Sequence, residues 1–286
     1  MRTVTTRAAL TAALAQLPRP VGLVPTMGAL HDGHAALISA ARAEQASVVL
    51  SIYVNPRQFG NPADLAAYPR TLEADAQRAA AAGVDLLFLP DDREIYPPAV
   101  EVATVEPGPL ALRLEGAARP GHFAGVATVV TILFDLVAPE VAYFGEKDAQ
   151  QVRVVEWLAE RRTPPIRIRR IATVRDGDGL AMSSRNARLS PAARRAASAI
   201  PQALAAVKSL HAAGERRADL LKDAAIRTIG SEPSLTLDYI DLADDVTLLP
   251  LGTSAHLSDA TSGRVLVSIA ASIEGVRLID AITLRG

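Results

Sequence analysis

Short apolar runs alternate with segments of helical spacing from Val21 to Val174, and this alternation is the strongest constraint on the fold. Apolar runs separated by helices of about ten to fifteen residues are typical of a parallel sheet with both faces covered. We therefore expect an α/β fold with a Rossmann-like, doubly wound parallel sheet that binds ligands at the carboxyl ends of its strands. The expected strands are 21–24, 47–54, 84–89, 141–144 and 166–174, and the expected helices are 34–42, 71–82, 126–137 and 149–161.

The pattern changes after Val174, where we place a domain boundary. Ser190 followed by Pro191 is a typical helix start, with serine as the N-cap. Helical segments are expected over 192–213, interrupted at Pro201, and over 218–229, whereas 235–242 and 264–284 alternate like antiparallel strands. We expect a first domain over 1–173 and a smaller α+β lid domain over 174–286. Within the first domain we also expect an amphipathic helix over 1–20 and a short hairpin strand at 101–106.

Composition excludes several classes of function. The chain has 286 residues, enough for two hydrophobic cores. It holds 30 lysines and arginines against 31 aspartates and glutamates, so we expect neither nucleic acid nor a membrane surface as a partner. It has no cysteine, which excludes disulfides, thiolate zinc sites and a cysteine nucleophile. The N-terminus does not resemble a signal peptide and no run of about 18 apolar residues occurs, so we expect a cytoplasmic protein.

The segment Val21–His34, VGLVPTMGALHDGH, combines a buried strand, a glycine turn and a helix start. In this geometry the backbone N–H groups and the helix dipole favour an anion. His31 and His34 lie three residues apart, on one face of the first helical turn. Three roles are open to them: helix capping, zinc binding with a third ligand that the segment does not supply, or donation by neutral imidazoles to phosphate oxygens. The chain has no P-loop motif, and Gly177-Asp178-Gly179 lacks the third glycine of a dinucleotide turn.

Six motifs follow one another between residues 25 and 186. They are PTMGALHDGH at 25–34, VNPRQF at 54–59, YPRT at 68–71, RPGHFAG at 119–125, GEKDAQQ at 145–151 and DGLAMSSRN at 178–186. Together and in this order they resemble the motifs of the pantothenate synthetase (pantoate–β-alanine ligase) family, within the HIGH-motif nucleotidylyltransferase superfamily. The last hundred residues resemble that family only in general character.

This resemblance implies an ATP-dependent ligase that condenses pantoate with β-alanine and releases AMP and pyrophosphate. The pantoate carboxylate would attack the α-phosphorus of ATP, and the amine of β-alanine would then attack the resulting pantoyl adenylate. Because a carboxylate approaches a polyanion, such a site must neutralise charge and hold the attack in line. The resemblance also implies Mg²⁺ and a homodimer formed through the N-terminal domain, with which the apolar segment 47–54 is compatible.

The resemblance also assigns roles to single residues. His34, helped by His31, would stabilise the transition state at phosphorus, and Lys147 with Arg185 would form a cationic clamp. The residues expected at ATP are Pro25, Thr26, Met27, Gly28, Ala29, Leu30, His31, Asp32, Gly33, His34, Gly145, Glu146, Lys147, Asp148, Val174, Met182, Ser183, Ser184 and Arg185. Those expected at pantoate or β-alanine are Gln58, Gln151, Asn55 and Arg119, with His122 shaping the same loop, and Asp75 is the candidate for the magnesium region.

Three positions depart from the family pattern. Arg57 stands where an apolar residue is expected, and would either alter the wall of the pantoate pocket or point to solvent. Ala149 replaces an aromatic residue and loosens local packing. Ala74 separates Glu73 from Asp75 where adjacent acidic residues are expected.

Two other functions remain open. A nucleotidyltransferase would use the same histidines but attach AMP or CMP to a phosphorylated cofactor precursor; the uncharged Gln58 and Gln151 disfavour a second phosphate, whereas Arg57 leaves it open. A non-catalytic nucleotide sensor is the other, and the intact histidines and cations argue against it. If an adenylate forms, a lid must exclude water, and Gly177 and Gly179 lead us to expect motion over 174–185.

Overall fold

The computed structural model describes all 286 residues, which form two compact units. The first unit comprises Met1–Glu146 and Gln151–Ala172, and the second comprises Lys147–Gln150 and Thr173–Gly286. The segment Lys147–Gln150, which the sequence analysis places in the first domain, therefore groups with the second unit. Each unit has its own hydrophobic core.

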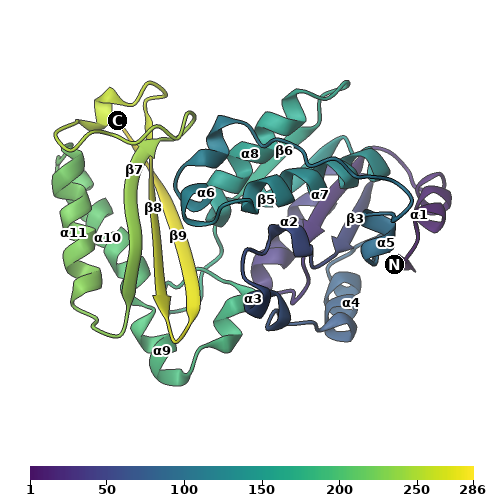
Figure 1. Cartoon of the computed structure of the whole chain (residues 1–286), viewed down its shortest axis with the longest axis horizontal. Helices are drawn as coiled ribbons and strands as arrows, with labels where there is room; N and C mark the ends of the chain where they lie inside the picture. The colour runs from purple at the N-terminus through teal and green to yellow at the C-terminus, as the bar shows by residue number, and fades with distance from the viewer. The chain divides into compact units, whose positions relative to one another are not determined.

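The first unit is built on a six-stranded parallel sheet of order β1-β4-β3-β2-β5-β6. Figure 1 labels β3, β5 and β6 of this sheet. Strand β2 pairs with β3 on one side and β5 on the other, and the chain proceeds outward from this centre in both directions. The switch point therefore lies at the carboxyl ends of β2 and β5. This confirms the expected Rossmann-like α/β fold. The strands are β1 (Arg2–Val4), β2 (Val21–Thr26), β3 (Ser47–Ile52), β4 (Leu86–Phe88), β5 (Val141–Gly145) and β6 (Arg167–Ile171).

Helices cover both faces of this sheet. Alternate strand residues point to opposite faces. Leu23 and Val49 therefore pack into one cluster with residues of α1 and α7, while Val24 and Leu50 pack into a second with α2 and α4. The helices are α1 (Arg7–Leu14), α2 (Asp32–Glu44), α3 (Pro62–Ala66), α4 (Leu72–Ala81), α5 (Asp92–Ile95), α6 (Glu115–Ala118), α7 (His122–Val137) and α8 (Ala149–Glu160), with 3₁₀ turns η1 (Pro56–Gln58), η2 (Pro109–Leu112) and η3 (Glu146–Asp148).

Several local expectations for this part of the chain are wrong. Residues 1–20 begin with strand β1, which pairs with β4, before α1 starts at Arg7. No strand forms at 101–106, where the N–H of Val105 donates to Thr128 Oγ1 (3.0 Å) instead of to a neighbouring strand. Helix α7 starts at His122, before the expected 126, because Gly121 takes a left-handed conformation at its N-cap. Every residue of β3 is buried inside the sheet, so 47–52 is core and gives no support to a subunit interface.

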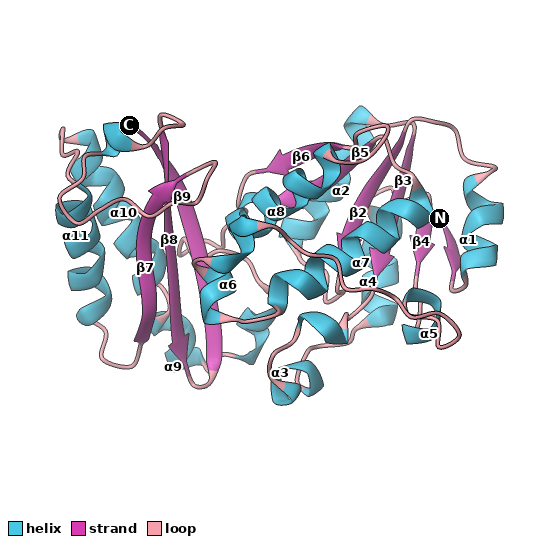
Figure 2. Cartoon of the chain, turned by 45° about the horizontal axis from the view of Figure 1, so that its top comes forward, coloured by secondary structure: helices cyan, strands magenta, loops and turns pink.

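The second unit packs helices against a three-stranded antiparallel sheet of order β7-β8-β9 (Figure 2). Its elements are η4 (Ser184–Arg188), α9 (Pro191–Ala196), α10 (Ala199–Ala212), α11 (Ala218–Gly230), β7 (Thr236–Asp244), η5 (Leu257–Asp259), β8 (Arg264–Ile273) and β9 (Val276–Arg285). Ser190 caps α9 as expected. The helical break lies at 197–198 and not at Pro201, which sits in the first turn of α10, where proline needs no N–H partner. No helix of the structure is both long and apolar enough to cross a bilayer.

Candidate active site

His31 and His34 cap helix α2 reciprocally. The backbone N–H of Gly33 donates to His31 Nδ1, and the backbone N–H of His31 donates to His34 Nδ1, both at 3.2 Å. The two rings lie 4.1 Å apart between centroids. A backbone N–H is always a donor, so each Nδ1 must be an acceptor, and a neutral imidazole then carries its hydrogen on Nε2. Capping and donation to an anion are therefore compatible roles, because they use opposite nitrogens of the same rings.

The turn that precedes α2 is held by one buried carboxylate. Asp75, on α4, is 1% exposed, and its two oxygens accept from the backbone N–H groups of Ala29 (2.9 Å) and Leu30 (2.7 Å). The Thr71 hydroxyl adds a third hydrogen bond at 3.1 Å. Gly28 has φ +83°, and a Cβ there would lie 2.9 Å from Ile52 Cγ2 and 3.0 Å from Asp75 Oδ2. Only glycine fits this contact, so the turn is fixed in one shape.

Asp75 was expected in the magnesium region, at the ion or just behind its ligands, and in this structure it holds the backbone of the 26–30 turn. A magnesium ligand needs carboxylate oxygens directed at the ion, whereas both oxygens of Asp75 are engaged by the 29–30 backbone. No group of three His, Asp or Glu side chains in the structure could hold a metal ion. The residues present therefore do not form a protein-built magnesium site.

Gln58 lies at the end of η1 and is held by its side chain and by its backbone. Asn55 Nδ2 donates to Gln58 Oε1 (3.1 Å), and Gln58 Nε2 lies 3.0 Å from the sulfur of Met27 in the turn after β2. The Gln58 carbonyl accepts from His122 Nδ1 (2.9 Å) and from an Arg119 guanidinium nitrogen (3.4 Å). Arg119 also donates to His122 Nε2 (3.2 Å), which is consistent with the hydrogen of that ring being on Nδ1.

Arg119 and Asn55 thus hold Gln58 in place through hydrogen bonds to its backbone carbonyl and its side chain. Gly125 allows the close approach of α7 to this segment, because a Cβ at this position would lie 2.3 Å from the carbonyl oxygen of Arg57. Helix α7 consequently packs directly on the η1 backbone, and the RPGHFAG motif serves to hold Gln58. Arg57 is exposed, which agrees with the expectation that it points to solvent. Its guanidinium stacks 3.9 Å from the centre of the Tyr96 ring and donates to the Val102 carbonyl (3.2 Å).

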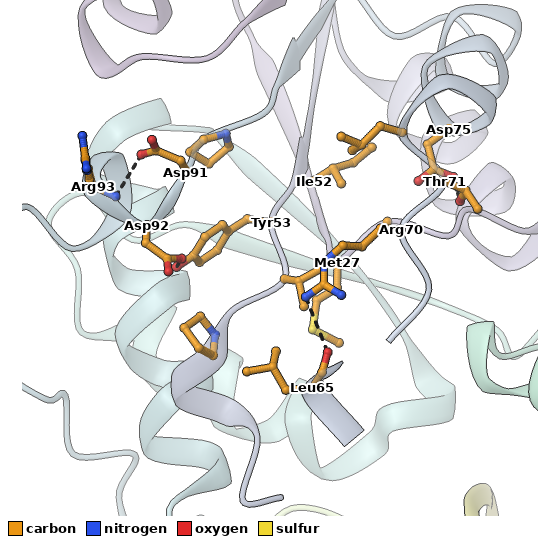
Figure 3. Close-up of a pocket in the computed structure, with 15 residues that line it drawn as sticks. Met27, Ile52, Tyr53, Leu65, Arg70, Thr71, Asp75, Asp91, Asp92 and Arg93 are labelled. Atoms are coloured by element: carbon orange, nitrogen blue, oxygen red, sulfur yellow. Dashed lines mark hydrogen bonds between the residues drawn. The ribbon is translucent and has the colours of Figure 1, made fainter. Parts of the chain in front are cut away.

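A cavity of about 480 Å³ opens beside the 26–30 turn. Met27, Gly28 and Asp75 line it, whereas His31, His34 and Gln58 do not. Figure 3 shows Asp75 and Thr71 on one side of this cavity, and Tyr53 with Asp92 across from them. The Tyr53 hydroxyl donates to Asp92 Oδ1 (2.7 Å), and burial together with this carboxylate raises the pKa of Tyr53.

The other expected site residues are divided between the two units. Gly145 ends β5, which pairs with β2 in the sheet, and Glu146 follows it. Gln151 lies in the first turn of α8, and all three residues belong to the first unit. The second unit contains Lys147 and Asp148, whose charged groups lie 3.9 Å apart, and the segment from Val174 to Arg185. In that segment the Val174 carbonyl accepts from Met182 N–H (3.0 Å), and Ser183 Oγ caps η4 by accepting from Arg185 N–H (3.2 Å).

The loop 175–181 is tied down more tightly than its glycines suggest. Arg175 makes two hydrogen bonds to Asp280 (2.5 and 2.9 Å), whose side chain is buried in β9. Arg194, on α9, donates to Asp176 (2.8 Å) and to Asp178 (2.9 Å). The hydrogen bond from Arg194 lowers the pKa of Asp178.

The sequence analysis missed Tyr96, whose hydroxyl donates to Asn55 Oδ1 (2.7 Å). Tyr96 stands in a proline-rich stretch with no strand or helix pattern, about forty residues away from Asn55 in the sequence. No pattern along the chain joins two such positions.

Comparison with known proteins agrees with these motifs. A family model described as pantoate-beta-alanine ligase matches residues 2–283. A pantothenate synthetase of Roseiflexus sp. (strain RS-1) is 47% identical over 280 residues, covering 98% of both chains. That of Corynebacterium glutamicum (strain R) is 46% identical over 287 residues, covering 99% of this chain and 100% of the relative.

Solved structures give the same result. A pantothenate synthetase of Thermus thermophilus matches with a TM-score of 0.90 at 44% identity, covering 99% of both chains. A pantoate-beta-alanine ligase of Francisella tularensis, in complex with beta-gamma ATP and beta-alanine, matches with a TM-score of 0.79 at 33% identity, covering 99% of this chain and 97% of that one.

Proposed function

Because this chain belongs to the pantoate-beta-alanine ligase family, we propose that it condenses pantoate with β-alanine through a pantoyl-adenylate intermediate. In the first step a pantoate carboxylate oxygen attacks the α-phosphorus of ATP, and pyrophosphate leaves with the electrons of the broken P–O bond. In the second step the amine of β-alanine attacks the acyl carbon and AMP leaves. The amine loses a proton as the amide forms.

The capping pair is the observation that carries the first step. The Nε2–H groups of His31 and His34 are donors whose rings are held by hydrogen bonds at Nδ1. Donors fixed before the reaction stabilise developing charge without reorganisation. We assign them to the phosphate oxygens, with His34 at the reacting phosphorus, and we assign Lys147 and Arg185 to charge neutralisation at the same phosphates.

The turn 25–33 and the segment 145–148 are proposed to line the nucleotide. They begin at the carboxyl ends of β2 and β5, the strands on either side of the switch point, where doubly wound sheets bind their ligands. Asp148 is assigned to the ribose hydroxyls and the Val174 backbone to adenine, with Met182–Arg185 beside the phosphates. The Francisella tularensis relative, in complex with beta-gamma ATP and beta-alanine, supports the choice of both substrates.

Gln58 and Gln151 are proposed to bind pantoate. Amides suit a substrate that carries a carboxylate and two hydroxyls, because they form hydrogen bonds without adding charge. Asn55 and Arg119 act through Gln58, since both hydrogen-bond to it. The residues present do not hold Mg²⁺ by themselves. The ion would bind together with the nucleotide, through the phosphate oxygens, and keep several of its water ligands.

The test is isotope exchange between ATP and pyrophosphate, with pantoate and Mg²⁺ present and β-alanine omitted. Pantoate-dependent exchange is expected, because without β-alanine the adenylate can react with labelled pyrophosphate and return to ATP. Exchange that appears only with a phosphorylated acceptor would indicate a nucleotidyltransferase instead. Absence of exchange with any acceptor, despite ATP binding, would indicate a nucleotide sensor.

We also propose a homodimer, on the family resemblance alone. Light scattering coupled to gel filtration would then give twice the 30.1 kDa of one chain. A mass of one chain across a wide range of protein concentrations would contradict it.

A further inference from the structure

The Asn55 side chain has only one orientation that satisfies its neighbours. Its Oδ1 accepts from the backbone N–H of Arg57 (3.3 Å), and its Nδ2 donates to the backbone carbonyl of Gly125 (3.1 Å). A flipped amide would set N–H against N–H and oxygen against oxygen. Asn55 is 1% exposed, so water does not compensate for such a mismatch. These two backbone contacts therefore identify which amide atom is the oxygen and which is the nitrogen, without any assumption about side-chain protons.

The orientation of Gln58 follows from that of Asn55. Asn55 Nδ2 lies 3.1 Å from Gln58 Oε1, which must be the acceptor because Nδ2 only donates. Gln58 Nε2 then faces the opposite way, toward the sulfur of Met27 at 3.0 Å. Thioether sulfur is a weak acceptor. Gln58 is thereby arranged to offer N–H donors, and not its oxygen, on the side of the 26–30 turn.

The Tyr96 hydroxyl completes this chain of hydrogen bonds. It lies 2.7 Å from Asn55 Oδ1, and because that oxygen only accepts, Tyr96 must donate. Desolvation, partly offset by the Arg57 charge, raises the pKa of Tyr96 to about 12, so the hydroxyl keeps its proton at neutral pH. The ring is held by the Arg57 guanidinium 3.9 Å from its centre. The departure at Arg57 thus packs against the ring whose hydroxyl donates to Asn55.

We propose that Tyr96 is a positioning residue which, through Asn55, fixes Gln58 as a contact that only donates hydrogen bonds. Such a contact selects substrates that place an acceptor oxygen there, such as a carboxylate, and rejects groups that donate. This rests on the proposed function, in which Gln58 contacts the acid substrate.

The kinetic test compares Tyr96→Phe with Tyr143→Phe. Both variants lose one hydroxyl and keep the ring, but the Tyr143 hydroxyl donates to Glu44 (3.0 Å) and not to Asn55. Loss of one buried hydrogen bond should raise the KM for pantoate about tenfold in Tyr96→Phe while changing the KM for ATP less than about twofold. Tyr143→Phe should leave both KM values near those of the wild type. An unchanged pantoate KM in Tyr96→Phe, or an equal rise in both KM values, would overturn the proposal.

A second measurement needs no substrate. In ¹H–¹⁵N spectra of the full chain, the side-chain amide resonances of Asn55 and Gln58 should shift, and exchange faster with water, in Tyr96→Phe but not in Tyr143→Phe. Unchanged resonances would overturn the positioning role even if kinetics changed. Conversely, if the variant shows the spectral effect but the wild type gives no pantoate-dependent exchange, the proposed function is refuted and the orientation of Gln58 remains supported.

Discussion

The backbone N–H of His31 donates to Nδ1 of His34 at 3.2 Å, so the side chain of the second histidine in the motif caps the backbone of the first. This contact fixes the His34 ring at the start of α2 and leaves Nε2–H as the donor. The motif spacing of three residues is what allows it, because residues N-cap and N3 of a helix face each other. The structural role of His34 therefore uses Nδ1, and its proposed chemical role uses Nε2–H.

His34→Asn is expected to separate these two roles. Asparagine places an oxygen near the position of Nδ1 and has no counterpart of Nε2–H. The variant should keep its melting temperature but lose about 100-fold or more in ATP–pyrophosphate exchange, the usual cost of removing one fixed transition-state donor. His34→Ala should lose the exchange and about 1 kcal/mol of stability as well, because the cap is gone. Near wild-type exchange in His34→Asn would remove Nε2–H from the chemistry.

Asp75→Asn should disturb the 26–30 turn, which we propose to line the nucleotide. An amide has one acceptor oxygen, so the N–H of either Ala29 or Leu30 would face an NH₂ group in a buried site. We expect a loss of about 1–3 kcal/mol in the free energy of unfolding, together with a raised KM for ATP. Chemical denaturation and initial-rate kinetics measure the two effects. Glu73→Gln is the matched control, since Glu73 is exposed on the same helix; equal behaviour of the two variants would contradict the anchoring role.

Asp244 should govern part of the acid stability of the second unit. Burial raises its pKa, but hydrogen bonds from the N–H groups of Thr247, Ser262 and Val246 outweigh burial and hold the pKa well below its usual range. A lowered folded-state pKa stabilises the fold above the unfolded value of about 3.9, and this contribution is lost as the pH falls toward the folded value.

Asp244→Asn is therefore expected to lower stability at pH 7 by about 2–3 kcal/mol, the usual value for hydrogen bonds to a charged group. The variant should also weaken the dependence of stability on pH below about pH 5. Urea denaturation at a series of pH values measures both. Asp223→Asn, at an exposed position on α11, is the control. A pH dependence that is the same in wild type and Asp244→Asn would show that the buried carboxylate is not responsible.

Arg194→Ala should loosen the loop 175–181. Arg194 is the cation that Asp176 and Asp178 share, and its removal leaves two like charges close together. Amide hydrogen exchange of this loop should become faster, while Arg195→Ala, an exposed neighbour on α9, should have no effect. If the loop exchanges equally fast in both variants and the wild type, the glycines and not the ion pairs determine its mobility.

The alternation of apolar runs and helices was enough to predict the parallel sheet and its helices. Burial on both faces forces a strand such as β3 to be apolar in most of its length, and this is visible along the chain. The short motifs likewise pointed to Gln58, His31 and His34 as candidate site residues before the structure was known. The predicted helix boundaries were wrong where a glycine or proline sets them. Gly121, for example, starts α7 before its apolar pattern begins.

The family and the class of fold could be inferred before any coordinates, because they depend on local periodicity and on short motifs. The same motifs gave the residues proposed for the site. Which atom of each residue is used became clear only from the folded chain. Asp75 holds the 29–30 backbone, and Tyr96 orients Asn55. Each of these contacts joins residues about forty or more positions apart in the chain. The direction of a hydrogen bond depends on which donor and acceptor are buried face to face, and no periodicity along the chain encodes that.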